Sequence, residues 1–375
     1  MRNFLKGLVV YSGTIIAIAL VMSFLATLVS PATFWPLAYF GLAFPVLLLM
    51  NLVVFVLLII HKKKTVIIPL IAFIICIEPA SNFFQFRIQA PKNKFEHRDV
   101  KILTYNVHLF NLINWNDTPN KLEDVVRFIN SQKPDIVCLQ EFCLTSSPEV
   151  QKKIKKLYAN YPYRHIEYSM TSKKYNFGIA TLSKFPIIKK GVLPFDKTAN
   201  VSIYSDIKIG KDTVRLYNSH LQSTRLREKN VNLLLNQKFQ NSDKKMEELK
   251  DFNTRLFVAY EKRAIQVKIV AKHREKSKYP VIMAGDYNDP PISYSYRKMR
   301  GNLTDAFKEA GSGFGSTYVG MLRILRIDYI FHAPAIKATE YASPRVNYSD
   351  HYPVVVNLAF PKNLRGVELK TNTTK

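Results

Sequence analysis

The feature that most constrains the fold of this chain is its apolar first quarter. Within residues 1–86, the runs Leu8–Val29 and Phe34–Ile60 are apolar over at least the ~20 residues that a membrane-spanning helix needs. A third run, Thr65–Ile77, is shorter and spans only if it continues to Phe86. Because a backbone in lipid must satisfy its own hydrogen bonds, these runs predict two or three transmembrane helices.

The basic residues around these runs predict their orientation. Arg2 and Lys6 precede the first run, the loop Ser30–Thr33 has no charge, and His61–Lys64 forms a basic loop. Since loops rich in Lys and Arg remain cytoplasmic, three spans place the rest of the chain outside, whereas two spans leave it in the cytoplasm. We therefore expect a multi-pass protein of a bacterial inner membrane, with its large domain on the outer, periplasmic side.

Residues 87–98 form a polar linker, residues 99–362 a large domain, and residues 363–375 a polar tail. Alternating or continuous apolar patterns in the large domain predict strands at Val100–Phe110, Asp135–Gln140, Phe177–Ser183, Pro186–Ile188, Val201–Ile209, Thr213–Leu221, Val281–Ala284, Arg326–His332 and Pro353–Leu358. Helical spacing follows Thr118, covers Pro148–Asn160 and recurs in Arg225–Lys276. This mixture predicts an α/β domain with two sheets packed face to face.

Composition narrows the classes of function. The chain has 54 Lys and Arg against 28 Asp and Glu, and the net charge of +26 favours anionic partners such as nucleic acid, acidic lipid head groups or phosphorylated substrates. The three cysteines contain no C-x-x-C pair, so neither a zinc site nor a disulfide framework is indicated. No P-loop or nucleophile elbow is present.

Polar side chains follow several of the predicted strands. The run Val281–Ala284 leads into Gly285-Asp286-Tyr287-Asn288, and strand alternation places Asp286 and Asn288 on one face. Other strand ends carry Asn106, Glu141 and the pair Asn218 and His220, and two more segments supply Asp328 and the pair Asp350 and His351. Each residue alone is more often a turn or cap residue, but together the segments suit one reaction.

Oxygen ligands of this kind suit Mg²⁺, Mn²⁺ or Ca²⁺. Glu141 is the best single ligand candidate, because a charge directly after the apolar run Ile136–Leu139 needs compensation. Asn106 can orient a ligand or bind the metal through its carbonyl oxygen.

The other polar residues suit the remaining steps of phosphoester hydrolysis. Asp286 can act as general base on a water, and Asp328 can keep His351 cationic near a phosphate. His220 can donate a proton or a hydrogen bond to a phosphoryl oxygen. A metal, a base and a cation together indicate hydrolysis of a phosphoester.

The order of these motifs resembles the endonuclease/exonuclease/phosphatase superfamily, which has the DNase I-like fold. The matching motifs are Tyr-Asn106-Val, Leu-Gln-Glu141, Asn218-Ser-His220-Leu, Gly-Asp286-x-Asn288, Arg-Ile-Asp328-Tyr and Ser-Asp350-His351-Tyr-Pro, and they cover about residues 99–360. The resemblance implies a four-layer α/β sandwich and attack of water on a phosphoester that depends on Mg²⁺, with Mn²⁺ as an alternative.

The resemblance also implies roles for single residues. Glu141 becomes the main metal ligand, with Asn106 nearby and Asp350 at the metal. Asp286 and Asn288 activate and orient the water, while His351, supported by Asp328, contacts the phosphate. His220 is similar to a proton donor or phosphate binder of the nuclease branch. Asn218, Arg263 and Asn176 are the candidate substrate-binding residues.

The sequence departs from the family pattern in two places. His108 stands where some nucleases carry an acid, which leaves a second metal ligand open. The segment Arg225–Arg255 is longer than the minimal family connection and is interpreted as a helical insertion near the rim of the site.

Three functions remain, because this fold serves many chemistries. The spans favour a membrane-anchored phosphoesterase acting on a phospholipid or lipid pyrophosphate, since a tethered enzyme meets lipid at high effective concentration. A nuclease is the alternative, and its base-stacking groups would be Tyr294 and Tyr296. A non-catalytic scaffold is disfavoured by the intact polar residues. The expected partners are the bilayer and a phosphorylated substrate, and no obligate protein partner is indicated.

Overall fold

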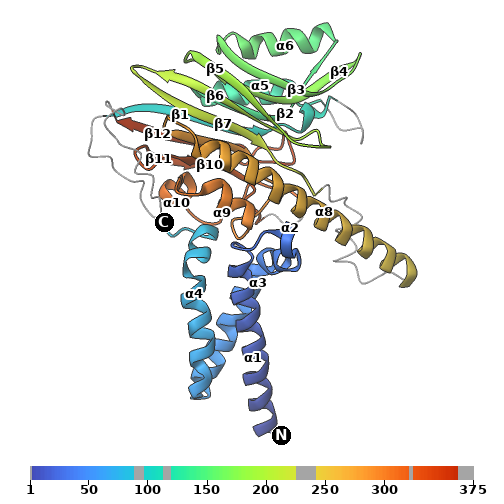
Figure 1. Ribbon diagram of the computed structural model, residues 1–375, viewed down its shortest axis with the longest axis vertical. Coiled ribbons are helices and arrows are strands. Elements are labelled where there is room, and N and C mark those ends of the chain that lie inside the picture. Colours follow the sequence, from blue (N-terminus) through green and yellow to red (C-terminus); the bar gives the residue numbers. More distant parts are fainter. Residues whose placement is uncertain (1, 88–96, 113–119, 225–241, 321–323, 362–375) are drawn as a thin grey trace. The chain divides into compact units, whose positions relative to one another are not determined.

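The computed structural model describes residues 2–87, 97–112, 120–224, 242–320 and 324–361 (Figure 1). The chain divides into two compact units. The helical unit consists of Met1–Phe84, Ser223–Val267 and Asp289–Lys298, and the sandwich unit consists of Gln85–Gln222, Lys268–Asn288 and Met299–Lys375. The expected linker and tail lie almost entirely outside the described residues.

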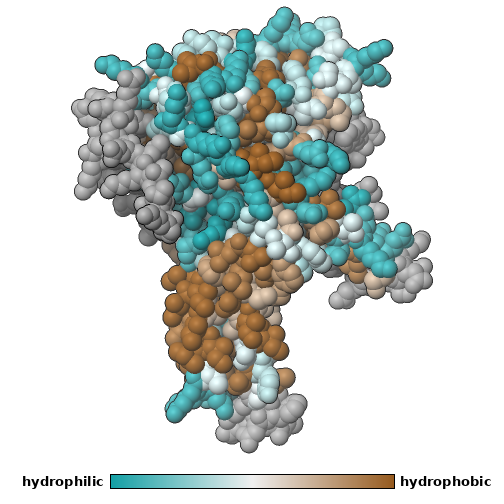
Figure 2. Space-filling view, viewed as in Figure 1, coloured by the Kyte–Doolittle hydropathy of each residue, from teal (hydrophilic) through white to brown (hydrophobic). Residues whose placement is uncertain are grey.

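The helical unit contains the three apolar runs as helices. They are α1 (Arg2–Leu25), α3 (Pro36–Ile60) and α4 (Ile67–Phe83), with the short α2 (Pro31–Phe34) before α3 and the 3-10 turn η1 (Lys64–Val66) before α4. All three are long and apolar enough to cross a membrane, the third as Lys64–Phe83. Figure 2 shows the apolar surface of this bundle. The third run therefore continues as helix through Glu78 and Pro79 and ends at Phe83, three residues before the expected end at Phe86.

The helical unit also takes in part of the region predicted as an insertion. Residues 225–241 lie outside the described residues, and the rest begins the long helix α8 (Ser242–Glu275). Trp35 packs edge-on against Phe257 of α8, with ring centroids 5.6 Å apart. This contact, together with a hydrogen bond between Tyr39 and Asn253, fixes α8 to the start of α3.

The sandwich unit contains two six-stranded mixed sheets. The first has the order β11-β12-β1-β2-β4-β3 and the second the order β5-β6-β7-β8-β10-β9. The first sheet comprises β1 (His97–Asn106), β2 (Ile136–Thr145), β3 (Tyr163–Thr171), β4 (Tyr175–Ser183), β11 (Lys337–Ala342) and β12 (Val354–Pro361). The second comprises β5 (Ile187–Pro194), β6 (Val201–Ile209), β7 (Asp212–His220), β8 (Val281–Asp286), β9 (Thr304–Asp305) and β10 (Asp328–His332). The pairs β1/β2 and β7/β8 are parallel.

Strand alternation builds the layers of this unit. Every second residue of β1, such as Val100 and Ile102, packs into the core between the sheets, while Leu103 and Tyr105 face a second core under helices. Those helices are α5 (Leu122–Gln132) and α6 (Pro148–Tyr158). The last turns of α8 and the short helix α10 (Ala306–Ala310) also belong to this unit, whereas α9 (Tyr294–Arg300) belongs mostly to the helical unit. The expected α/β sandwich of two sheets flanked by helices is confirmed.

The predicted strands differ from the observed ones mainly at edges. The strand expected to reach Phe110 ends at Asn106, because residues 108–111 turn with positive φ angles. The edge strands β3 and β11 were not predicted, since an edge strand has one neighbour and these two carry many polar side chains. The helix start expected at Thr118 lies outside the described residues, and α5 begins at Leu122.

We expect Ile282→Ala to lower the free energy of unfolding by about 2–5 kcal/mol, because Ile282 is fully buried between the sheets and its truncation leaves a cavity. Ile188→Ala, at a side chain that is 55% exposed, is the matched control and should change it by less than about 0.5 kcal/mol. Denaturant unfolding of the full chain in detergent, followed by circular dichroism, measures both. Equal effects would contradict the assigned core.

Candidate active site

The core between the two sheets changes from apolar to polar along its strands. The inward residues of β8 are Ile282, Ala284 and then Asp286, and those of β7 are Val214, Leu216, Asn218 and His220. Asn106 ends β1 and pairs with Gln140 in the middle of β2, and Asp328 at the start of β10 pairs with Asp286. Because parallel strands β7 and β8 are in register, His220 lies directly beside Asp286. One end of the sandwich core is therefore a polar cluster.

Asp286 lies at the centre of this cluster and is fully buried. Its Oδ2 accepts hydrogen bonds from the side-chain amides of Asn106 and Asn288, each at 3.0 Å, and its Oδ1 accepts one from the Asn288 backbone N–H at 2.9 Å. The Nε2 atoms of His220 and His351 lie 3.7 Å and 3.8 Å from Oδ2. Burial raises the pKa of Asp286 to about 6, against the opposing charge of His351. Such a carboxyl is well matched to proton transfer near neutral pH.

Asn288 holds the backbone after β8 in place. Its φ of 52° lies in the left-handed region, which asparagine tolerates better than most residues. Its side-chain amide also donates to the carbonyl oxygen of Leu221 at 3.0 Å, which joins the ends of β7 and β8.

His351 and Asp328 form a buried pair. His351 Nδ1 lies 2.9 Å from Asp328 Oδ2, and the backbone N–H of Asp328 donates to Thr317 Oγ1 at 3.1 Å. Burial alone would lower the pKa of His351, but the carboxylates of Asp328 and Asp286 raise it well above its ordinary value. His351 is therefore held as a cation beside the Asp286 carboxylate, where it can meet an anionic group.

Glu141 reaches the cluster through a break in strand alternation. The pairing of β2 with β4 shifts between Leu139 and Phe142, and Glu141 has a φ of 49°. Regular alternation would place Glu141 on the helix-covered face with Leu139, but the bulge brings its Oε1 to 3.3 Å from Asn106 Nδ2 and 3.6 Å from His220 Nε2.

The residues around Glu141 fit a divalent cation. Burial and the charge of Asp350 raise the pKa of Glu141, so the two carboxylates destabilise each other as anions. Asp350 is half exposed and accepts a hydrogen bond from Ser349 Oγ at 3.2 Å. A cation bound by hard carboxylate oxygens would offset this repulsion. Asn106 directs its amide nitrogen at both Glu141 and Asp286, so it orients the carboxylates, while its carbonyl oxygen accepts from His108 N–H.

A second grouping, Asp286, Asp328 and His351, also has ligand atoms within 4.8 Å of one another. His351 Nδ1 and Asp328 Oδ2 already bond to each other. These two atoms are therefore engaged with each other, whereas the carboxylates of Glu141 and Asp350 repel each other and are also candidate cation ligands.

The three expected substrate-binding residues lie in three different places. Asn218 is fully buried in the layer beneath the polar cluster, where it receives a hydrogen bond from Gln140 at 2.7 Å and donates one to the carbonyl of Ala180 at 2.9 Å. Asn176 lies on β4 opposite Leu144, and no described contact joins it to the cluster. Arg263 belongs to the helical unit, where it pairs with Asp289.

Sequence reasoning missed the residues that support the site from beneath. Gln140 Nε2 bonds to Thr104 Oγ1 at 3.1 Å as well as to Asn218, forming a buried polar layer between the apolar core and the cluster. Thr317, which accepts the Asp328 N–H, comes from a loop with no distinguishing pattern. Gln140 directly precedes Glu141 on an inward position, and that signal was available in the sequence.

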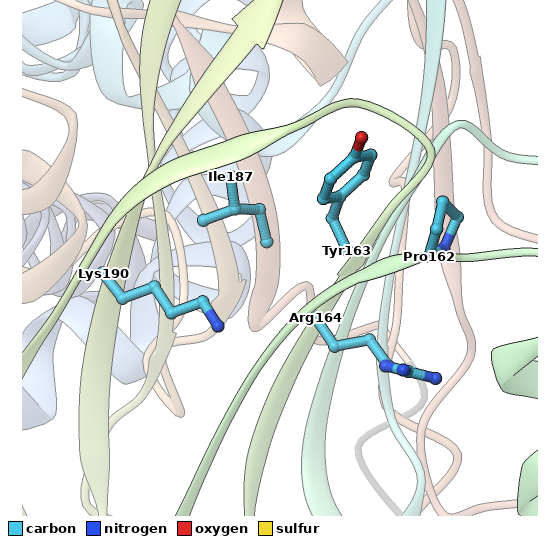
Figure 3. Close-up of a pocket in the computed structure, with 5 residues that line it drawn as sticks. All are labelled: Pro162, Tyr163, Arg164, Ile187 and Lys190. Carbon is cyan, nitrogen blue, oxygen red and sulfur yellow. The ribbon is translucent and has the colours of Figure 1, made fainter.

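A pocket of about 350 Å³ lies away from these residues, between the edge strands β3 and β5 (Figure 3). It is lined by Pro162, Tyr163, Arg164, Ile187 and Lys190, and none of these belongs to the polar cluster. The chemistry of the protein is therefore better placed at the polar cluster than at this open pocket.

The sandwich of two sheets, with a polar cluster at one end of its core, is the basis for comparing the chain with known proteins. Residues 103–351 match the model of the Endonuclease/Exonuclease/phosphatase family, and the chain belongs to that family. Its members are hydrolases, among them nucleases and phosphatases, and they generally use a divalent metal. Residues 6–83 match a separate domain of unknown function. No curated protein matches the chain.

Several solved structures are similar to this chain. An endonuclease/exonuclease/phosphatase from Beutenbergia cavernae is 17% identical with a TM-score of 0.51, covering 70% of this chain and 72% of that one. A family protein from Bacteroides thetaiotaomicron is 16% identical with a TM-score of 0.49, covering 71% and 99%. A mannosyl-6-phosphatase of the same organism is 15% identical with a TM-score of 0.46, covering 70% and 100%. The likeness to the Beutenbergia cavernae protein, at 17% identity, extends to the fold alone.

We expect activity to fall as the pH drops below about 6, because protonation of Asp286 removes the proposed base. Asp328→Asn should move both limbs of the pH–rate profile to lower pH, since the Asp328 charge raises the pKa of both His351 and Asp286. Profiles of kcat for the wild type and this variant test both statements, with circular dichroism as the control for folding. An alkaline limb that stays in place would contradict the assigned role of Asp328.

Proposed function

We propose that the protein is a membrane-anchored, divalent-metal-dependent phosphoesterase that hydrolyses a phosphate ester or pyrophosphate of a lipid-linked substrate by attack of water. The observation that carries the proposal is the buried Asp286 carboxylate, which lies between two histidines and beside Glu141. This arrangement combines a base, a cation and a metal-binding carboxylate at one polar end of the core.

Each residue has a distinct task in this reaction. Asp286 accepts the proton of the attacking water, and Asn288 holds the Asp286 carboxylate in place. His351, kept cationic by Asp328, meets the charge that develops on the phosphoryl oxygens. His220, beside both Glu141 and Asp286, donates to the phosphate or leaving group. Mg²⁺, or Mn²⁺ in its place, held by Glu141 and Asp350, would polarise the phosphoryl group.

Chain connectivity favours a lipid-linked substrate. His220 is three residues before Ser223, and Asp286 three residues before Asp289, and at both points the chain enters the unit that carries the apolar helices. Three residues reach at most about 11 Å, so two of the strands that supply the site lead at once into the helical unit. A phosphate on a membrane lipid suits this connection better than a nucleic acid does.

The alternative function, a nuclease, is weakened because its candidate base-stacking residues are buried. Tyr294 and Tyr296 are 5% and 1% exposed, so neither presents a ring on which a base can stack. The net charge of +26 is compatible with either substrate and does not distinguish them.

The full chain in detergent, offered a polyprenyl pyrophosphate and plasmid DNA in parallel with Mg²⁺, tests the proposal. We expect phosphate release from the lipid, intact plasmid, and loss of release with EDTA. Glu141→Gln should abolish turnover, since it removes the charge that binds the metal, and Asp286→Asn and His351→Ala should do the same with the fold retained. Nicked plasmid without phosphate release would make the protein a tethered nuclease. No activity on either would leave the scaffold function.

We also propose that the sandwich unit lies outside the cytoplasm, as three spans and the basic loop His61–Lys64 predict. The native Cys76, Cys138 and Cys143 are buried, so single cysteines can be introduced as reporters. Lys152→Cys on α6 should react with a membrane-impermeant maleimide on spheroplasts, whereas Lys62→Cys should react only after permeabilisation. The side chains of Lys152 and Lys62 are both exposed, so the two positions are matched in accessibility. The reverse pattern would place the domain in the cytoplasm.

A further inference from the structure

The helical unit includes a short segment that comes from the catalytic region of the sequence. This segment, Asp289–Lys298, starts one residue after Asn288. Its Ile292 is 1% exposed and belongs to the same apolar cluster as side chains of the three predicted spans. The span residues in that cluster are Ala17, Leu20, Phe44, Ala72, Cys76 and Phe83. The chain after the catalytic strand β8 is thus packed into the core of the bundle.

Gly41 of α3 makes this packing possible. A Cβ at Gly41 would lie 2.4 Å from the carbonyl oxygen of Ile292 and 3.3 Å from Ala26 Cβ. The first distance is far inside van der Waals contact, and the atom it meets is backbone rather than a flexible side chain. The close approach of the segment to the second span therefore requires glycine at this position.

A buried ion pair holds the start of the same segment. Arg263 Nε of α8 lies 3.4 Å from Asp289 Oδ2, and both side chains are at most 2% exposed. Arg263 also donates to Thr224 Oγ1 at 3.3 Å, and its guanidinium lies 4.7 Å from the ring centroid of Tyr260. Ser295 donates a hydrogen bond to the Asp289 carboxylate, and Ser293 Oγ donates to the carbonyl oxygen of Pro290 at 2.7 Å. Separating a buried ion pair leaves an uncompensated charge in the protein interior, which is strongly unfavourable. These contacts therefore hold the Asp289 side chain in one position.

We propose that the membrane helices position the catalytic carboxylate, through Gly41, Ile292 and the Arg263–Asp289 pair. Asn288 is the link, because it is bonded by the peptide chain to Asp289 and by two hydrogen bonds to Asp286. A shift of the segment moves Asn288 and with it the proposed base. The inference rests on the proposed function, and it assigns the four residues as positioning residues rather than catalytic ones.

Different kinetic effects are expected if the membrane helices only tether the enzyme and if they also position Asp286. A tether raises the local concentration of a lipid substrate, so weakening it changes KM for lipid and leaves a soluble substrate unaffected. A positioning device sets the geometry of the base, so disturbing it lowers kcat on soluble and lipid substrates alike. The split between kcat and KM therefore separates the two.

Three glycines of the bundle give a matched series of variants. Gly41→Ala introduces the clash with the Ile292 backbone. Gly13→Ala introduces a clash of similar depth, 2.5 Å, with the flexible Val54 side chain of the same bundle but touches no part of the segment. Gly7→Ala meets nothing within 4 Å. Alanine favours helix at each position, so the series varies only the contact that the new methyl makes.

The experiment measures kcat and KM of the full chain in lipid nanodiscs on a soluble chromogenic phosphate ester. We expect Gly41→Ala to lower kcat at least about tenfold with little change in KM, and Gly13→Ala and Gly7→Ala to retain it within about twofold. Asp289→Asn, which keeps the size of the side chain but removes its charge, should give the same loss as Gly41→Ala. Unchanged kcat in Gly41→Ala, or an equal loss in Gly13→Ala, would overturn the proposal.

Hydrogen–deuterium exchange separates this inference from the proposed function. Gly41→Ala and Asp289→Asn should raise exchange of the backbone amides in residues 286–298, whereas Gly13→Ala and Gly7→Ala should not. This readout needs no substrate. Absence of hydrolysis by the wild type would remove the proposed function while exchange still tests the coupling. Equal exchange in all variants would overturn the coupling even in an active enzyme.

Discussion

The structure of the site depends on one buried charge, the carboxylate of Asp286. A carboxylate inside a protein core is strongly disfavoured unless hydrogen bonds and opposite charge compensate it. Two asparagine amides, a backbone N–H and two histidines surround this group. They belong to four residues: Asn106 and His220 end β1 and β7, Asn288 follows β8, and His351 precedes β12. Despite these contacts, burial raises the pKa of Asp286 to about 6, so the carboxylate can take up a proton. The groups that stabilise the buried carboxylate therefore also leave it suited to proton transfer.

The two units of the chain are interleaved in sequence rather than placed one after the other. The chain leaves the sandwich unit after Gln222 and again after Asn288, and on both occasions it has just supplied site residues. A domain hung on a flexible linker would need no such arrangement. The buried Ile292 and the glycine at position 41 give this interleaving a physical basis, since the segment after Asn288 is part of the apolar core of the bundle. The proposed lipid-linked substrate and the proposed positioning role follow from the same connection.

Much of the fold and of the site could be predicted from local pattern, and the failures have identifiable causes. Asp286, His220 and Asp328 are inward residues at strand ends, so two-residue alternation was enough to group them. Asn218, a candidate substrate-binding residue, lies two residues before His220 on β7, where Gln140 and Ala180 are the hydrogen-bond partners of its amide. The edge strands β3 and β11 were missed because their polar faces weaken the apolar pattern. Tyr294 and Tyr296 were the candidate base-stacking groups of a nuclease, and both are buried.

The sequence by itself determined which segments are apolar enough to span a membrane, which strands form the sandwich, and which polar residues end those strands. These properties depend on short-range periodicity and composition, which the order of residues contains directly. Only the tertiary structure decided that a bulge turns Glu141 toward Asn106, that Arg263 pairs with Asp289, and that Ile292 joins the core of the bundle. These contacts join residues far apart in the chain, and they depend on packing between elements whose approach no local pattern specifies.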